Sequence, residues 1–289
     1  MPFNLQTFKT RALTSVVFVV VMLAGIFVNH WTFLLLFSVI HFGCWVEYQK
    51  LVALIDPGYA TINKVHKYSV MLAGWGIMLW NTTAIYNLGS LKIFEAGKFL
   101  FLVMAGVLIV SALLSKPFKP KLLAHSFFGL IYISLSWALL INIYCQGIIS
   151  GADFGWVIII LLIGSIWIND TMAYIVGSFI GKTPLSPVSP KKTWEGTIGG
   201  AALAIATVTI VSHLVFHGVN NLLIMFLSLI AVVMGTLGDL FESKLKRLAN
   251  VKDSGSIMPG HGGFLDRFDS LLVATPFVWL YLYIVQHLL

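Results

Sequence analysis

Residues 155–178 read GWVIIILLIGSIWINDTMAYIVGS, and this run decides the class of fold. A helix needs about 20 mostly apolar residues to cross the hydrocarbon core of a bilayer, and this run supplies them. The rest of the chain agrees, because 58% of its 289 residues are hydrophobic, 10% are charged and the mean hydropathy is +0.93. Soluble domains carry about 25% charged residues. The sequence therefore predicts an all-α polytopic membrane protein and excludes a disordered chain, a coiled coil and an ordinary cytosolic enzyme.

Eight further stretches have the length and apolar character of a spanning helix. Together they give nine predicted spans, near 13–29, 31–49, 68–87, 99–115, 123–146, 155–178, 196–217, 221–238 and 269–288. No small-residue cleavage site follows the first stretch, so it is expected to be a retained helix rather than a removed signal. We expect residues 1–150 to hold spans one to five and residues 151–289 to hold spans six to nine.

Lysine and arginine indicate how these spans are oriented, because cytoplasmic loops carry an excess of both. With the N-terminus in the cytoplasm, 16 of the 18 basic residues fall in cytoplasmic segments, and only Lys92 and Lys98 fall outside. The sequence therefore predicts a cytoplasmic N-terminus and an external C-terminus. Lys116, Lys119 and Lys121 are expected to be topology signals only.

Several features are expected to be structural. Cys44 and Cys145 lie in apolar runs, so neither a disulfide framework nor cysteine chemistry is expected. No basic run exceeds two residues, so no nucleic-acid partner is expected despite a net charge of +7. Glu47, at the end of the second span, is expected to be an interface anchor. The small residues of span seven, including Gly196, Gly199 and Gly200, are expected to allow close helix packing.

The chemistry-bearing residues gather in two polar segments, 179–195 and 239–269, both cytoplasmic in the predicted topology. Seven of the eleven acidic residues lie from Asp170 onward, and charge that a membrane protein concentrates in one region is typical of a functional site. Residues 235–270 read GTLGDLFESKLKRLANVKDSGSIMPGHGGFLDRFDS. Helical spacing places Asp239, Glu242, Ser243 and Lys246 on one face.

A glycine-rich loop over 253–263 follows this face, and its backbone N–H groups can approach anionic oxygens closely. Asp266 and Asp269 come after it, three residues apart. Carboxylates suit a hard cation such as Mg²⁺, and lysine and arginine suit phosphates. The segment therefore predicts phosphoryl or nucleotidyl transfer, without a Walker or kinase motif.

These residues resemble a known signature. Ser243 to Arg247, Lys252 to Gly255, Pro259 to Gly263 and Asp266 to Asp269 resemble that of phosphatidate cytidylyltransferases, also called CDP-diglyceride synthetases. A second block resembles the family's other motif, through Asp170 to Tyr174, Gly177, Gly181, Lys182 and Ser189 to Gly196. The specific resemblance covers about 165–270. Ser178 departs from it, because members often carry Arg or Lys there, and Lys182 could supply that phosphate contact instead.

The resemblance implies an activity and its cofactors. It implies that CTP and phosphatidic acid react to give CDP-diacylglycerol and pyrophosphate at the cytoplasmic face of the inner membrane. It also implies dependence on Mg²⁺, with K⁺ as a candidate second cation, and leaves a homodimer open. The attacking phosphate oxygen is already anionic at neutral pH, so no general base is needed. The difficulty is bringing two polyanions together, and cations should dominate the site.

The resemblance also implies residue roles, with catalysis in residues 151–289. The implied metal ligands are Asp239 and Asp266, and the carboxylates that orient lysines are Asp170, Glu242 and Asp269. The implied catalytic residues are Lys246, Arg247, Lys252, His261 and Arg267. The implied substrate-binding residues are Lys182, Ser189, Lys191, Lys192, Thr193, Ser243, Asp253, Gly262 and Gly263. Lys191 and Lys192 could instead anchor the chain at the membrane surface, and Asp170 could instead lock two helices together.

Two other functions stay open at this point. A secondary transporter should show repeats and charges near the middle of the membrane, whereas these charges cluster in cytoplasmic segments. A CTP-dependent enzyme acting on a polyprenol-type lipid is disfavoured by the signature, although hydropathy does not separate it from a phosphatidate enzyme.

Overall fold

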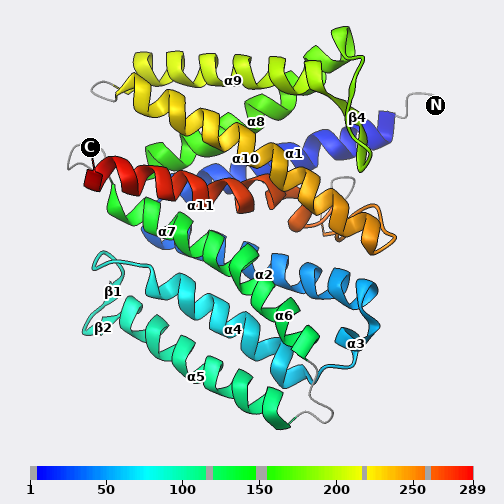
Figure 1. The fold of residues 1–289 in the computed structure, drawn as a ribbon. Coiled ribbons are helices and arrows are strands. Elements are labelled where there is room, and N and C mark those ends of the chain that lie inside the picture. The colour runs from blue at the N-terminus through cyan, green and yellow to red at the C-terminus, as the bar shows by residue number, and fades with distance from the viewer. Residues whose placement is uncertain (1–4, 115–119, 148–154, 217–219, 258–261, 289) are drawn as a thin grey trace. The chain divides into compact units, whose positions relative to one another are not determined.

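The computed structural model describes residues 5–114, 120–147, 155–216, 220–257 and 262–288. Within these residues the chain is helical, apart from connecting turns and two short antiparallel hairpins (Figure 1). The helices are α1 Leu5–Phe27, α2 His30–Ile55, α3 Pro57–Ala60, α4 Lys64–Trp80, α5 Ile93–Leu114, α6 Pro120–Gly129, the π-helical turn η1 Leu130–Leu135, α7 Ser136–Gln146, α8 Gly155–Ile180, α9 Trp194–Val215, α10 Asn221–Leu248 and α11 Leu265–Leu288. The strands are β1 Asn87–Leu88, β2 Leu91–Lys92, β3 Pro184–Ser186 and β4 Ser189–Thr193.

Seven helices in the described part of the chain are long and apolar enough to cross a membrane. They are α2, α5, the continuous helix from α6 through η1 to α7, α8, α9, α10 and α11. Many of their outward side chains are large and apolar, and Phe99 and Leu114 of α5 are 71% and 75% exposed. Lipid tails contact such surfaces without cost, whereas exposing them to water is unfavourable. The protein is an all-α, multi-pass membrane protein, as predicted.

The two remaining long helices are shorter in their apolar part. These are the Leu13–Phe27 portion of α1 and the 17-residue α4. All nine predicted stretches overlap a helix, but the prediction for 68–87 is wrong at its end, because α4 stops at Trp80. The side chains of Asn81 and Thr82 bond back to the carbonyls of Ile77 and Leu79 at 2.9 and 2.7 Å, which ends the helix. The number of crossings and the side on which each terminus lies stay predictions.

The chain divides into two compact units. The first comprises Met1–Asn142 and Leu245–Phe268, and the second comprises Ile143–Lys244 and Asp269–Leu289. The end of α10, the glycine-rich loop and the first turn of α11 therefore belong to the same unit as the N-terminal helices.

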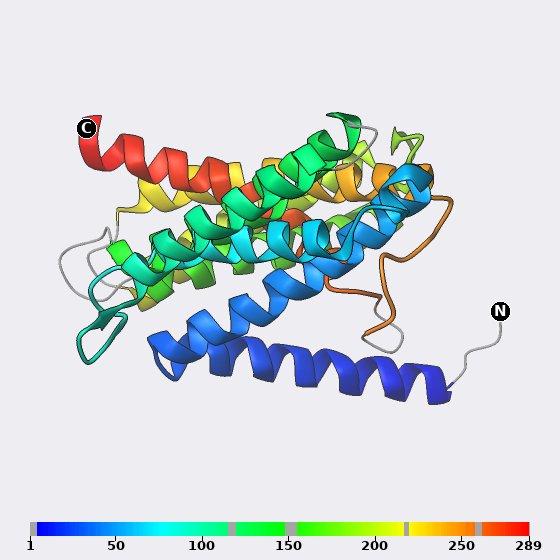
Figure 2. The same ribbon diagram turned by 90° about the horizontal axis from the view of Figure 1, so that it is seen from below.

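The first unit is built around buried aromatic side chains. Phe37, Trp45 and Trp137 are fully buried, and the Trp45 Nε1–H donates to Ser134 Oγ at 2.9 Å. Helices α4 and α5 approach closely because Gly97 has no side chain: a Cβ there would lie 2.5 Å from the backbone nitrogen of Trp80. Helices α1 and α2 meet at the short connection near Asn29 and diverge from it (Figure 2). Asn29 begins α2 by accepting a hydrogen bond from the Thr32 N–H.

The second unit is organised by close packing of α8 against α9. A Cβ on Gly200 would lie 2.6 Å from the Ala173 nitrogen, and one on Gly196 would lie 2.7 Å from the Ala173 oxygen. The prediction that small residues of span seven allow close packing is therefore confirmed. Val157, Leu161, Val208 and Ile224 form a buried apolar cluster between α8, α9 and α10.

Helix α10 ends just before the glycine-rich loop, and its last turn is closed by backbone hydrogen bonds. The Val251 N–H donates to the Lys246 carbonyl at 3.0 Å, and the Asn250 N–H donates to the Arg247 carbonyl at 3.1 Å. Asn250 has φ of 55°, the left-handed conformation that this Schellman-type ending needs and that asparagine tolerates well. The ending turns the chain out of the helix toward Ser254.

Candidate active site

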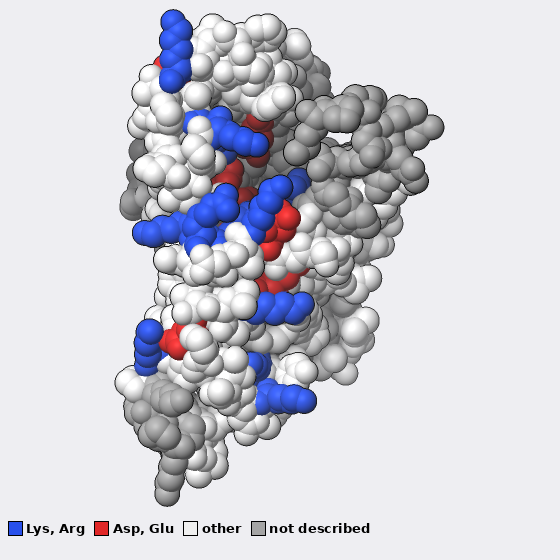
Figure 3. All heavy atoms as spheres, turned by 90° about the vertical axis from the view of Figure 1, so that its right-hand side faces the viewer, with Lys and Arg blue, Asp and Glu red and all other residues white. Residues whose placement is uncertain are grey.

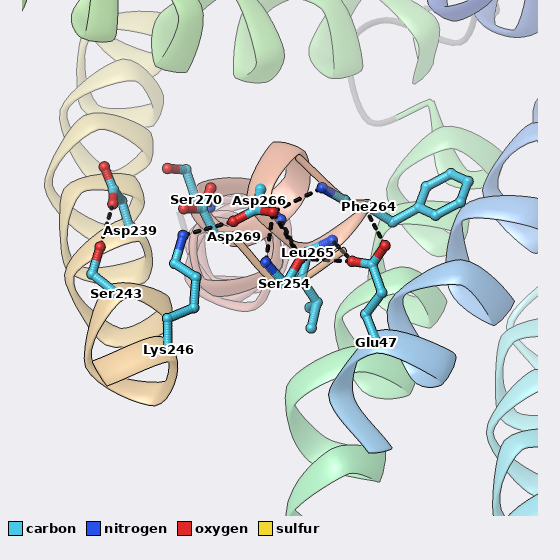
Figure 4. Close-up of polar contacts among 11 residues, drawn as sticks. Glu47, Asp239, Ser243, Lys246, Ser254, Phe264, Leu265, Asp266, Asp269 and Ser270 are labelled. Atoms are coloured by element: carbon cyan, nitrogen blue, oxygen red, sulfur yellow. Dashed lines mark hydrogen bonds and ion pairs between the residues drawn. The ribbon is translucent and has the colours of Figure 1, made fainter. Parts of the chain in front are cut away.

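In the first unit the centre of the polar network is the carboxylate of Asp266, in the first turn of α11. Its Oδ2 accepts hydrogen bonds from the Ser254 N–H at 2.8 Å, the Gly263 N–H at 2.8 Å and the Ser254 hydroxyl at 2.9 Å. Its Oδ1 receives the Lys246 ammonium at 2.6 Å (Figure 4). One oxygen is thus fixed by the loop, and the other faces the ammonium of Lys246.

Glu47 of α2 ties the N-terminal helices to this loop. The N–H groups of Phe264 and Leu265 donate to its two carboxylate oxygens, each at 2.9 Å, and the Ser254 hydroxyl lies 2.7 Å from Oε2 (Figure 4). The single hydroxyl proton of Ser254 is shared between Glu47 and Asp266. Glu47 is 5% exposed. The prediction of an interface anchor is therefore wrong: Glu47 caps the N-terminus of α11, where negative charge and free N–H groups are complementary.

The glycines of the loop make room for these carboxylates. Gly262 has φ of +82°, which side chains rarely adopt, and a Cβ there would collide with the Asp266 carboxylate. A Cβ on Gly263 would collide with the Glu47 carboxylate. The loop was predicted to bring backbone N–H groups to anionic oxygens, and here those oxygens belong to Asp266 and Glu47.

In the second unit a cavity of about 490 Å³, lined mostly by residues with polar side chains, lies along α8, α9, α10 and β4. Its lining comprises Asn169, Asp170, Ala173, Tyr174, Gly177, Ser178, Ser189, Lys191, Lys192, Thr193, Thr197, Thr236 and Asp239. The Lys192 ammonium pairs with Asp239 Oδ2, and the Ser243 hydroxyl donates to Asp239 Oδ1 at 3.2 Å. Residues from both predicted polar segments, 179–195 and 239–269, therefore meet at one cavity.

The β3–β4 hairpin that carries Lys191 and Lys192 is fixed to the start of α9. The Thr193 hydroxyl accepts a hydrogen bond from the Gly196 N–H at 3.2 Å and so caps the helix. Glu195 in the first turn of α9 accepts from the Lys182 N–H at 3.1 Å and from the Thr183 hydroxyl at 2.8 Å. The backbone of Lys182 is thereby held, while its side chain is exposed and does not line the cavity. Ser178, the residue that departs from the family pattern, does line it.

The other residues implied by the resemblance lie as follows. Glu242 and Asp269 are buried, and the Ser270 N–H donates to Asp269 Oδ1 at 2.6 Å. The remaining described residues are exposed, namely Arg247, Lys252, Asp253 and Arg267. His261 lies outside the described residues. On the face drawn in Figure 3, acidic side chains lie beside lysine and arginine side chains, as the ion pairs within each unit require.

The donor set of the two predicted metal ligands fits a hard cation in part. In the described ranges no three His, Cys, Asp or Glu side chains gather as a ready-made metal cluster. Asp239 faces a cavity that also holds Asp170 and several hydroxyls, which are oxygen donors of the kind Mg²⁺ prefers. Asp266 is pre-oriented by its loop, with Oδ1 turned toward a cation, Lys246. Each carboxylate thus already faces positive charge.

Sequence reasoning missed Glu47 and underused Ser254. Glu47 lies 217 residues before Phe264, and the only signal of its role in the sequence is a carboxylate at the end of a predicted span. An acid in a spanning segment is costly unless paired. That rule, applied to Glu47 as it was to Asp170, could have identified it.

A multi-pass helical protein with a lysine–carboxylate pair at a cavity lined by hydroxyl groups has the features of a membrane enzyme that handles phosphate groups. The chain matches the Cytidylyltransferase family over residues 9–285. The chain belongs to this family.

Named relatives agree with this membership. The chain is 35% identical over 246 residues to the phosphatidate cytidylyltransferase of Thermotoga maritima, covering 81% of this chain and 87% of the relative. It is 30% identical over 288 residues to that of Haemophilus influenzae, covering 93% and 96%. A shorter match, 47% identical over 115 residues, joins it to the Bacillus subtilis enzyme and covers 39% of this chain and 43% of that relative.

Proposed function

We propose that this membrane cytidylyltransferase converts CTP and phosphatidic acid to CDP-diacylglycerol and pyrophosphate in phospholipid synthesis. The family membership and the names of its full-length relatives support this activity. The observation that carries it for this chain is the cavity of about 490 Å³ at which Lys191, Lys192, Asp170 and Asp239 meet. It offers cations to phosphates and carboxylates to a metal.

The reaction needs charge compensation more than proton transfer. An oxygen of the lipid phosphate attacks the α-phosphorus of CTP, a new P–O bond forms, and the bond to the β-phosphate oxygen breaks to release pyrophosphate. Because the attacking oxygen is anionic, no side chain has to remove a proton from it. Lys191 and Lys192 reduce the repulsion between the two substrates, as cations do in phosphoryl transfer.

Asp239 and Asp266 would hold Mg²⁺, and K⁺ would be the second cation. Bound Mg²⁺ supplies charge stabilisation on the phosphate oxygens. Because the backbone and Ser254 hold Asp266 Oδ2, Oδ1 would be the oxygen offered to the metal, and Lys246 would then bind a phosphate. Arg247, Lys252 and Arg267 are exposed cations for the triphosphate, and His261 completes the catalytic set.

Further residues serve the same substrates. One set is proposed to bind phosphate or headgroup, and of this set Ser189, Lys191, Lys192 and Thr193 line the cavity. A second set of carboxylates is proposed to orient the lysines. The binding set is Lys182, Ser189, Lys191, Lys192, Thr193, Ser243, Asp253, Gly262 and Gly263, and the orienting set is Asp170, Glu242 and Asp269.

The bacterial relatives support an inner-membrane location. The distribution of lysine and arginine supports a site that faces the cytoplasm. A reporter fused after Leu289 should then be external, and one inserted beside Lys121 should be cytoplasmic. Finding both on one side would mean that the number of spans differs by an odd number. A homodimer is part of the proposal, and cross-linking in the native membrane tests it.

The activity is tested with the purified full chain, CTP, Mg²⁺ and phosphatidic acid. The liponucleotide and pyrophosphate are both measured, and they should form in equal amounts. Lys192→Gln should lower turnover at least about 10-fold, because it removes a preorganised charge at the cavity. Lys98→Gln removes an equal charge from an exposed site and should have no effect. Product formed with a polyprenol phosphate but not with phosphatidic acid would refute the substrate assignment.

A further inference from the structure

The first unit contains a pocket of its own, and its lining residues lie far in the sequence from the two motif blocks. It has a volume of about 360 Å³ and is lined by α2, α3 and α4. Its lining residues are Val46, Gln49, Lys50, Ala53, Ala60, Lys64, Lys67, Tyr68 and Met71. Three of the nine are lysines and none is acidic. A pocket with three ammonium groups and no carboxylate is complementary to an anion.

The lysines differ in how they are held. The Lys67 ammonium donates to the Ala60 carbonyl at 3.2 Å and lies 5.7 Å from the centre of the Tyr59 ring, so it is fixed at the wall. Lys50 and Lys64 are exposed, and neither has a hydrogen-bond or ion-pair partner among the described residues. Two charges are therefore left uncompensated at the mouth of a pocket whose third charge is preorganised.

Both acids on these elements are already engaged, and Glu47 accepts the N–H groups of Phe264 and Leu265. Asp56, between α2 and α3, lies 3.1 Å from the Lys121 ammonium and 3.4 Å from His125 Nε2. The hydrogen bond from Lys121 holds the pKa of Asp56 below its usual range, so this carboxylate stays charged and paired at neutral pH. It does not line the pocket and leaves the three lysines uncompensated.

The remaining walls are apolar, which points to an amphiphile rather than a small ion. Val46, Ala53 and Met71 line the pocket, and Val46 and Tyr68 are 43% and 61% exposed. Helix α2 has 26 residues and is about 39 Å long, whereas the hydrocarbon core is about 30 Å thick. Gln49 and Lys50, in the last third of this helix, therefore reach the headgroup level of the bilayer.

We propose that this pocket, lined by Lys50, Lys64 and Lys67, binds the phosphate headgroup of an anionic membrane phospholipid, separately from the proposed catalytic site. The three ammonium groups contact the phosphate, and the Tyr68 ring and the apolar wall cover the adjoining glycerol and upper acyl carbons. The site recognises net negative charge on a lipid, so a zwitterionic headgroup is a poor ligand.

The test uses the full chain in detergent and native mass spectrometry, with dioleoyl phosphatidylglycerol titrated against dioleoyl phosphatidylcholine. The wild type should bind phosphatidylglycerol at one tight site, and its affinity for phosphatidylcholine should be at least about tenfold lower. Lys50→Gln with Lys64→Gln should weaken that site about 25-fold, since each lysine near an anionic lipid contributes about fivefold. Lys92→Gln with Lys98→Gln removes the same charge from exposed residues of the same unit and should leave binding unchanged.

Two further arms decide the interpretation. Lys50→Arg with Lys64→Arg keeps both positive charges and should keep tight binding of phosphatidylglycerol. Loss of tight binding in this variant would show that positive charge does not determine the affinity, and would overturn the proposal. Inorganic phosphate at millimolar concentration should not displace the lipid. Displacement by phosphate, or undiminished binding in the double glutamine variant, would refute a lipid site at this pocket. Catalytic turnover does not enter the readout, so failure here leaves the proposed reaction untouched.

Discussion

Glu47→Gln is the substitution that most directly tests how the N-terminal helices support the catalytic loop. The carboxylate accepts N–H groups from Phe264 and Leu265 on different oxygens. An amide keeps one acceptor and presents its NH₂ to the other N–H, so one hydrogen bond is lost and a donor is left facing a donor. Ser254 also loses a partner if the amide nitrogen occupies the Oε2 position.

The magnitude follows from these contacts. A hydrogen bond to a charged group contributes about 1.5–3 kcal/mol, and a buried donor left unsatisfied costs about 1–3 kcal/mol. The loop and the first turn of α11 should therefore lose about 3 kcal/mol of local stability, a factor of about 100 in the opening equilibrium. Asp266 should be misplaced more often, so kcat should fall while the KM for phosphatidic acid changes little.

The assay combines hydrogen exchange with kinetics. Exchange of the Ser254, Gly263, Phe264 and Leu265 amides should accelerate in Glu47→Gln, while amides in the α8–α9 pair keep their protection. Glu95→Gln makes the same chemical change at a residue that is exposed and forms only a surface ion pair, so it should match the wild type. Wild-type exchange at the loop, with turnover within about twofold, would refute the role assigned to Glu47.

Three other substitutions test separate parts of the structure. Asp266→Asn keeps the shape and the backbone hydrogen bonds but removes the charge, so turnover should fall at least about 10²-fold, and near-normal turnover at saturating Mg²⁺ would contradict the ligand assignment. Gly200→Ala should lower the free energy of unfolding by about 1–3 kcal/mol because its Cβ meets the Ala173 backbone. Gly164→Ala, with nothing within 4 Å, should be neutral or stabilising in the same thermal unfolding experiment; equal losses in both would remove the packing argument. His261→Gln keeps an N–H donor and should retain measurable activity. Its rate should rise with pH as the wild-type rate does, following the second ionisation of the substrate phosphate, whose pKa is about 6. If His261→Gln were as inactive as His261→Ala and the wild-type rate did not follow that ionisation, His261 would be a base.

The sequence alone was enough for the class of fold because hydropathy acts locally. Twenty apolar residues can cross a bilayer only as a helix that satisfies its own backbone, so the run at 155–178 predicts α8 without knowledge of its neighbours. The same locality explains the error at 68–87, where Asn81 and Thr82 end α4 early by bonding to preceding carbonyls. Hydropathy averages over such residues and does not detect them.

The kinds of side chain at the site could also be predicted from the sequence. The signature places carboxylates, lysines and glycines at fixed spacings along α10, the loop and α11. What each residue contacts was decided only by the tertiary structure. Gly262 and Gly263 were assigned to substrate, yet their lack of side chains makes room for Asp266 and Glu47. Glu47 itself belongs to a helix 217 residues earlier than Phe264. Its role depends on which helix end α2 packs against, and no local pattern of residues encodes that pairing.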